Sequence, residues 1–502
     1  MTWGPSRRAL GRRALLSGLA AGVALPALAA PPTVSLRPAP RPGGRGGFVP
    51  SAEGLIADAD LGRAALSYVV ADRRTGEVLE AHAPDLPLPP ASVAKAITAL
   101  YALDSLGDDF RFRTRVLATG PIRGGRLEGD LVLAGSGDPV LDTDALAELA
   151  TRVTGAGVTA VTGRFLIWDG ALPRIPAIDA TQPETAGYNP ALSGLNLNFN
   201  RVHFEWRRSG NGWSVAMDAR SARHRPSVQV ARMRVVDRRG PVYTYRNAGG
   251  VDEWTVAAGA LGNGGSRWLP VRQPAAYTAE VFAAFARSRG LDLPAPERVS
   301  GAPAGTLLAE RRSPALRPML EGMLRYSTNI TAEAIGLQAS AARGPRPGGL
   351  DASAERMSAW LRGRIGREGP RLVDHSGLGV DSRISAADMV RTLVALGPEA
   401  DLSPILKDIP MRDAAYRPIP DSPLSIRAKT GTLHFVSALA GYATAPDGTD
   451  LAFATFSADL ERRAAIDAAE REVPRGARAW TRRARILQLR LIDRWRRAYA
   501  DA

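Results

Sequence analysis

Runs of apolar residues predict two β-hairpins, one near each end of the chain. Residues 65–71 and 78–82 are rich in aliphatic side chains and enclose a short turn that contains a glycine. Residues 437–444 and 451–456 repeat the pattern around the turn Pro446-Asp447-Gly448. Short strand-forming runs joined by such turns are typical of antiparallel pairs, so both hairpins are expected to belong to β-sheets.

Apolar residues spaced three and four apart predict helices. The predicted helices span residues 92–106, 144–154, 277–288, 316–341 and 479–499. The last of them is basic, with an apolar stripe formed by Trp480, Ala484, Leu487, Leu491, Trp495 and Tyr499. We interpret it as a closing helix that packs on a sheet, with peripheral membrane contact as the alternative.

The region from residue 114 to residue 290 has a different pattern from its flanks. Short β-like runs alternate with glycine-rich turns, and the helix at 144–154 interrupts them. These runs are residues 116–117, 131–133, 165–168, 228–235 and 242–245. The pattern predicts a β-rich insert of one or two small domains, with a mixed domain of strands and helices on either side.

The first 29 residues have the features of an export signal. Arg7-Arg8 and Arg12-Arg13 precede an apolar run that ends in Ala27-Leu28-Ala29, a small-x-small cleavage site. The sequence around Arg12 resembles a twin-arginine signal, and a general secretory signal is the alternative. We therefore expect export to the periplasm or cell envelope, with a Pro/Gly-rich leader at residues 30–50.

Composition and charge exclude several classes of site and partner. The chain has no cysteine, and its five histidines lack zinc-hydrolase spacing, so we expect neither a metal nor another cofactor. Subtracting the four signal arginines from the net charge of +15 leaves +11. The arginines are scattered and an exported protein does not meet a genome, so nucleic acid is not the expected partner. An anionic envelope polymer or membrane surface is one interpretation, and solvated charge without a partner is the other.

The distribution of lysine points to candidate chemistry. Of the 65 basic residues only three are lysines, and two of these, Lys95 and Lys429, lie in short motifs with serine or threonine. Lysine can lose its proton and act as a base, whereas arginine stays protonated. The selective use of lysine at these two places indicates amine chemistry.

The motif Ser92-Val93-Ala94-Lys95 opens the first predicted helix. Residues three apart lie on one helical face, so the amine of Lys95 can reach the hydroxyl of Ser92. A serine becomes a good nucleophile when a base takes its proton, and burial lowers the pKa of a lysine enough for that task. The motif alone also fits a solvated lysine on a helix face.

Two further motifs carry polar side chains suited to a substrate. Lys429-Thr430-Gly431-Thr432 precedes a predicted strand, where a lysine and two hydroxyls suit a carboxylate and the glycine permits close approach of a ligand backbone. Ser327-Thr328-Asn329 places a hydroxyl and an amide two residues apart, which project together only from a loop or helix junction. Each tripeptide or tetrapeptide alone also fits a structural turn.

The three motifs, taken in their order along the chain, resemble the motif set of a known group of proteins. Ser-x-x-Lys, Ser-x-Asn and Lys-Thr-Gly in this order form the motif set of penicillin-binding proteins and serine β-lactamases. The chain more narrowly resembles the class C low-molecular-mass penicillin-binding proteins, the D-alanyl-D-alanine carboxypeptidases/endopeptidases of peptidase family S13. The β-rich insert is typical of class C, and similar segments occur at residues 127–131, 135–139, 372–378 and 431–442.

The resemblance implies an α/β (α+β) fold of the penicillin-binding transpeptidase-like or β-lactamase-like type. Its catalytic domain is expected from residues 51–113 and 291–502, around the insert at 114–290. The implied substrates are peptidoglycan stem peptides, with β-lactams as inhibitors.

The resemblance also implies a role for each motif residue. Ser92 would be the nucleophile and Lys95 its base, Ser327 would relay a proton to the leaving amine, and Asn329 would orient the substrate and Lys95. Lys429 would supply positive potential, Thr430, Gly431 and Thr432 would form the substrate-binding strand edge, and the N–H groups of Ser92 and Thr432 would form the oxyanion hole.

Two positions depart from the family pattern. His375 stands where glycine is usual and is expected to alter the local backbone or the rim of the cleft, and Thr328 stands where asparagine is frequent. Asp374-His375-Ser376 is not expected to form a Ser-His-Asp relay, because adjacent side chains diverge; we interpret it as a structural turn.

Two rival functions remain at this point. A β-lactamase would use the same chemistry with faster deacylation, but the large insert argues against it. A non-catalytic envelope-binding protein would use the basic surface, but the intact motifs argue against it. The sequence leaves the balance between carboxypeptidase and endopeptidase activity open.

Overall fold

The central β-sheet is built from strands of both ends of the chain. A computed structural model describes residues 49–413, 415–467, 472 and 474–499. The sheet has six antiparallel strands in the order β17-β18-β19-β20-β1-β2. The strands are β1 (Ala65–Asp72), β2 (Val78–His82), β17 (Lys407–Asp408), β18 (Ser425–Leu433), β19 (Val436–Thr444) and β20 (Asp450–Ala458). Both predicted hairpins, β1–β2 and β19–β20, are confirmed.

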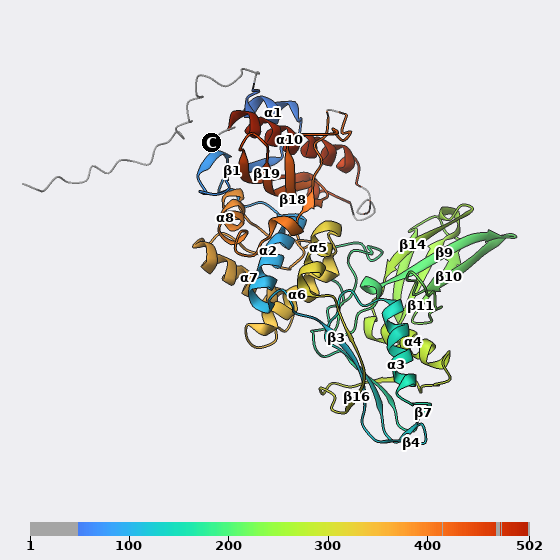
Figure 1. Cartoon of the computed structure of the whole chain (residues 1–502). Helices are drawn as coiled ribbons and strands as arrows, with labels where there is room; N and C mark the ends of the chain where they lie inside the picture. The colour runs from blue at the N-terminus through green and yellow to red at the C-terminus, as the bar shows by residue number, and fades with distance from the viewer. Residues whose placement is uncertain (1–48, 414, 468–471, 473, 500–502) are drawn as a thin grey trace, which may run out of the picture. The chain divides into compact units, whose positions relative to one another are not determined.

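Both faces of the sheet are buried, each against its own hydrophobic core. Alternate residues of a strand point to opposite sides, so a single strand can contribute to both cores. On β1, Val69 and Ala71 belong to one hydrophobic core, and Tyr68 and Val70 belong to another. Helices of the first core are α2 (Ala94–Leu106), α5 (Leu316–Tyr326), α6 (Asn329–Ala342), α7 (Leu350–Ile365) and α8 (Ala386–Leu396), and helices of the second are α1 (Ala52–Asp58) and α10 (Ala477–Ala498) (Figure 1). Shorter elements are η1 (Ala91–Val93), η4 (Ser403–Ile405) and α9 (Leu460–Ala464).

The C-terminal helix α10 closes the second face of the sheet. Its apolar stripe is buried through Trp480, Leu487, Leu491 and Trp495, and the helix contacts β19 and α1. This confirms the closing-helix interpretation.

The inserted region ends later than the sequence indicates. Its first strand, β3 (Arg113–Ala118), pairs with β16 (Thr306–Arg312), so the region extends to Arg312 rather than to residue 290. The correction has a topological cause: β15 (Pro296–Arg298) and β16 form the two edges of a five-stranded sheet with the order β15-β8-β6-β3-β16. Pairing between strands so distant in sequence leaves no local signal.

The insert contains several small sheets around two helices. The remaining elements are β4 (Ile122–Arg123), β5 (Arg126–Leu127), β6 (Leu131–Gly135), α3 (Thr143–Gly155), β7 (Ala160–Val161), β8 (Phe165–Trp168), η2 (Asn198–Asn200), β9 (Arg201–Ser209), β10 (Gly212–Asp218), β11 (Ala231–Val236), β12 (Tyr243–Ala248), β13 (Val251–Ala257), η3 (Ala258–Ala260), β14 (Gly264–Pro270) and α4 (Pro274–Arg287). They share a core that includes Leu146 of α3, Phe282 of α4 and Phe165 of β8. The β-rich character is as expected, although β9, β10, β13 and β14 were not individually predicted.

The predicted export signal at residues 1–29 lies outside the described residues, as does the leader up to residue 48. Within the residues that the structure describes, no helix is long and apolar enough to cross a membrane.

Candidate active site

The turn that carries Ser92 is held by close backbone contacts. Ser92 lies in η1, directly before α2, and its side chain is partly exposed. A Cβ on Gly377, whose φ is +73°, would lie 1.8 Å from the carbonyl oxygen of Ala91. A Cβ on Gly431 would lie 2.5 Å from the carbonyl oxygen of Pro90. Glycine at both positions therefore allows two distant segments to pack directly on the turn and fix Ser92.

Lys95 is completely buried beneath Ser92 and makes three hydrogen bonds. Its Nζ donates to Ser92 Oγ at 3.0 Å, to Asn329 Oδ1 at 2.8 Å and to the carbonyl oxygen of Ser376 at 2.7 Å. An ammonium has three donors, and these contacts use all of them. The amine is therefore fixed in direct contact with the Ser92 hydroxyl.

Two buried carboxyl groups surround this amine. Burial lowers the pKa of Lys95 to about 8, against the opposing effect of the charges of Asp374 and Glu333. Burial, followed by the charge of Asp374, raises the pKa of Glu333 to about 8. Glu333 also accepts the backbone N–H groups of His375 at 3.0 Å and Ser376 at 2.9 Å. It thereby positions the segment whose carbonyl group contacts Lys95.

The second lysine contacts the second motif serine. Lys429 is 1% exposed, and its Nζ donates to Ser327 Oγ at 3.0 Å and to the carbonyl oxygen of Thr430 at 2.7 Å. Burial, followed by the positive charge of Lys95, lowers the pKa of Lys429 well below its usual range. The Ser327 hydroxyl is therefore held by an amine, as the Ser92 hydroxyl is.

The predicted helix over residues 316–341 is interrupted at this serine. Ser327 has left-handed backbone angles (φ 59°, ψ 38°) and ends α5, and α6 begins at Asn329. The break confirms that Ser327 and Asn329 lie at a helix junction, from which both side chains reach the site.

The motif residues meet at a cleft of about 930 Å³. Ser92, Ser327, Asn329 and Thr432 line it, whereas the two lysines lie beneath its surface. β17 pairs with β18 only through Arg427 and Ala428 among the described residues, and of the motif residues that follow them Thr432 lines the cleft. An open strand edge of this kind suits an extended peptide.

The insert also reaches the site. Asn329 Nδ2 donates to the carbonyl oxygen of Tyr188 at 2.9 Å, and Tyr188 lines the same cleft. Thr181, Gln182 and Pro183 line it as well. A loop of the insert therefore forms part of the wall around Asn329.

His375 lies in the core and not at the rim of the cleft, so of the two expected effects, on the local backbone or on the rim, the one on the rim is wrong. Its side chain is fully buried, and its Nε2 lies 2.7 Å from Ser353 Oγ. A Cβ on Gly336 would lie 2.1 Å from the imidazole, so the missing side chain at Gly336 provides the space. Burial lowers the pKa of His375 to about 3, which keeps the ring neutral. Asp374 accepts the N–H groups of Gly377 and Gly379, both at 2.6 Å, so the segment is a structural turn as predicted.

Sequence reasoning missed two parts of the site. Glu333 had a usable signal, because it lies one helical turn after Asn329 within an otherwise apolar segment. Arg485 of α10 lines the cleft, but no signal in the sequence indicates this, because its position depends on how α10 packs.

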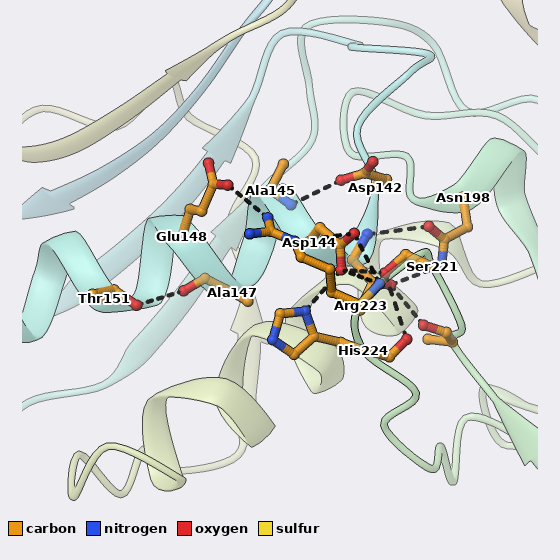
Figure 2. Close-up of polar contacts among 12 residues, drawn as sticks. Asp142, Asp144, Ala145, Ala147, Glu148, Thr151, Asn198, Ser221, Arg223 and His224 are labelled. Atoms are coloured by element: carbon orange, nitrogen blue, oxygen red, sulfur yellow. Dashed lines mark hydrogen bonds and ion pairs between the residues drawn. The ribbon is translucent and has the colours of Figure 1, made fainter.

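A second polar cluster lies in the insert, at the start of α3 (Figure 2). Ser221 Oγ donates to Asp144 Oδ1 at 2.5 Å, and His224 Nδ1 lies 2.7 Å from the same oxygen. Arg223 Nη2 donates to Glu148 at 2.7 Å. Because the serine and the imidazole both contact the carboxylate rather than each other, the geometry is not that of a catalytic relay. The cluster joins a loop to the first turns of α3.

Comparison with known proteins identifies the chain as a serine-type carboxypeptidase of the penicillin-binding class. The model of the D-Ala-D-Ala carboxypeptidase 3 (S13) family matches residues 51–473, and the chain belongs to this family.

Individual relatives agree with this assignment. A carboxypeptidase of Mycobacterium tuberculosis is 30% identical over 421 residues, which cover 80% of this chain and 78% of the relative. A D-alanyl-D-alanine carboxypeptidase of Actinomadura sp. is 27% identical over 443 residues, 80% of this chain and 79% of the relative. The crystal structure of penicillin-binding protein 4 from Haemophilus influenzae has a TM-score of 0.71 at 19% identity, covering 88% of this chain and 99% of that protein. This similarity confirms the predicted fold.

Proposed function

We propose that Ser92 attacks the carbonyl carbon of the D-Ala-D-Ala bond in peptidoglycan stem peptides. The observation that carries this proposal is the contact of 3.0 Å between Ser92 Oγ and the buried Nζ of Lys95. A lysine with a lowered pKa can lose its proton near neutral pH and then accept the proton of Ser92. The products of this step are an ester on Ser92 and, after the C–N bond breaks, free D-alanine.

The neighbouring groups support the remaining steps. Ser327, held by Lys429, is suited to pass a proton to the leaving amine. The N–H groups of Ser92 and Thr432 would stabilise the oxyanion, and Thr430 and Thr432 would hold the substrate carboxylate. Water then attacks the ester and releases the shortened peptide, so that Ser92 and Lys95 return to their first state.

We propose β-lactams as inhibitors that acylate the same serine. Penicillin-binding protein 4 of Haemophilus influenzae has been solved in complex with a β-lactam, and that structure has a TM-score of 0.67 with this chain. A β-lactamase would turn over nitrocefin continuously, whereas a slowly deacylating peptidase would stop after about one equivalent.

Digestion of purified muropeptides tests the proposal and the bond that is cleaved. We expect loss of the terminal D-alanine from pentapeptides, read by the mass of the products. Conversion of cross-linked dimers to monomers would add endopeptidase activity, which we include in the proposal. Products of unchanged mass from both substrates, with active enzyme controls in parallel, would contradict it.

We also propose that the chain acts in the periplasm or cell envelope, where its substrate lies. The arginine pairs and the apolar run of residues 1–29 support export. Expression in a bacterial host should yield a mature form that begins after Ala29, read by mass. Replacing Arg12 and Arg13 by lysine should stop export if the twin-arginine pathway is used.

The pKa of Lys95 predicts a pH dependence of acylation. A base acts in its neutral form, so the rate should rise about tenfold per pH unit below the pKa of about 8 and level off above it. The midpoint of this rise gives an apparent pKa that belongs to Lys95, Glu333 and Asp374 together, because the three buried groups interact. Because the charge of Glu333 raises the pKa of Lys95, Glu333→Gln should move the rise of the acylation rate to lower pH. Stopped-flow acylation by a fluorescent penicillin measures this profile, and a flat profile would exclude Lys95 as the base.

A further inference from the structure

One face of α10 forms part of the cleft wall. Arg478, Thr481, Arg482 and Arg485 line the cleft, and their spacing of three and four residues places them along a single helical stripe. The neighbouring stripe, with Trp480, Ala484 and Leu487, is buried against the sheet. Packing of α10 therefore directs a row of arginines into the space that Ser92 faces.

Arg485 reaches the edge of β18. Its Nη2 donates to Thr432 Oγ1 at 2.9 Å, across 53 residues of sequence. Thr432 is exposed in the cleft and follows Gly431, which packs on the turn of Ser92. The guanidinium thus lies beside the hydroxyl to which the proposed function assigns the terminal carboxylate.

The arginines of α10 that line the cleft differ from those further along the helix, and among the cleft-lining ones Arg485 is the one bonded to the motif strand. Arg490 pairs with Asp58, Arg496 with Asp447 and Arg497 with Asp493. Arg485 forms no ion pair with any acid in the part of the chain that the structure describes. A guanidinium has five N–H donors, and the bond to Thr432 uses one of them.

The motif lysine is poorly placed to supply this charge alone. Lys429 is buried, and its Nζ already donates to Ser327 and to the carbonyl oxygen of Thr430. A substrate that ends in a carboxylate still needs a cation that remains charged at every working pH, and arginine meets that requirement.

We propose that Arg485 binds the terminal carboxylate of a carboxypeptidase substrate together with Thr432, and that it makes binding of such a substrate depend on its free carboxylate. This inference rests on the proposed function. The planar fork of the guanidinium matches a carboxylate and forms two parallel hydrogen bonds. The family model matches residues 51–473, and Arg485 lies beyond them. The residue proposed to recognise the carboxylate is therefore part of the C-terminal helix α10.

Equilibrium binding tests the inference without requiring turnover. In a Ser92→Ala background, we expect Arg485→Ala to weaken binding of a tripeptide that ends in D-Ala-D-Ala about 10- to 100-fold, the range for a charge-assisted hydrogen bond. Binding of the same tripeptide as a terminal carboxamide should change less than about twofold. Arg485→Lys keeps the charge without the fork and should give an intermediate loss.

The matched control is Arg490→Ala, which removes an arginine of the same helix that pairs with Asp58. It should leave the binding of both peptides unchanged. Equal effects of Arg485→Ala on the acid and the amide, or no effect on either, would overturn the inference. The proposed function has a separate readout, since it fails if penicillin does not acylate the wild-type protein, and the two peptides can still be compared in that case.

Discussion

Replacing Ser92 by alanine is expected to abolish covalent labelling by penicillin and the release of D-alanine. The hydroxyl is the atom that forms the ester, so no residual base or oxyanion stabilisation can replace it. The fold should be retained, because Pro90 and Val93 are the cap residues of η1 and α2 and neither cap uses a side-chain hydrogen bond. We expect a loss of stability of about 1 kcal/mol or less.

Intact-protein mass spectrometry after incubation with penicillin measures this result, and thermal unfolding controls for the fold. Peptide mapping of the wild-type adduct should place the acyl group on Ser92. An adduct on another serine of the Ser92→Ala variant, such as Ser327, would assign the nucleophile elsewhere.

Local patterns predicted the parts of the site that depend on neighbouring residues. Ser92 and Lys95 are three residues apart on one helical turn, and the structure joins them at 3.0 Å. The hairpins were also predictable, because β1–β2 and β19–β20 each pair across a short turn. The contact between Lys429 and Ser327 spans 102 residues and was expected only from the resemblance to a known family.

Other features depend on packing that no local pattern reports. The imidazole of His375 fits beneath α6 because Gly336 has no side chain, and the two positions are far apart in sequence. The end of the insert depends on β16 pairing with β3. Arg485 reaches Thr432 only after α10 has packed on the sheet. In each case the sequence shows the residue type but not its partner.

Lys95→Arg should lower the rate of acylation by about 100- to 10,000-fold, the contribution typical of a general base. The guanidinium keeps the positive charge but cannot take the proton of Ser92. Because Lys95 is completely buried, the longer arginine also strains the core, so Lys95→Met serves as a second variant that removes the base without a larger head group. Both variants should lose acylation while circular dichroism confirms the fold.

Lys429→Arg is the matched comparison, because it changes the second motif lysine in the same way. An arginine there would provide N–H donors and a positive charge beside Ser327, so measurable acylation should remain if the variant folds around the longer side chain. The rate constant for acylation by a fluorescent penicillin should therefore separate the two variants by at least about tenfold. Equal losses of acylation in folded Lys95→Arg and Lys429→Arg proteins would contradict this division of roles. They would show that both buried amines take part in proton transfer, and that Lys429 contributes more than its charge.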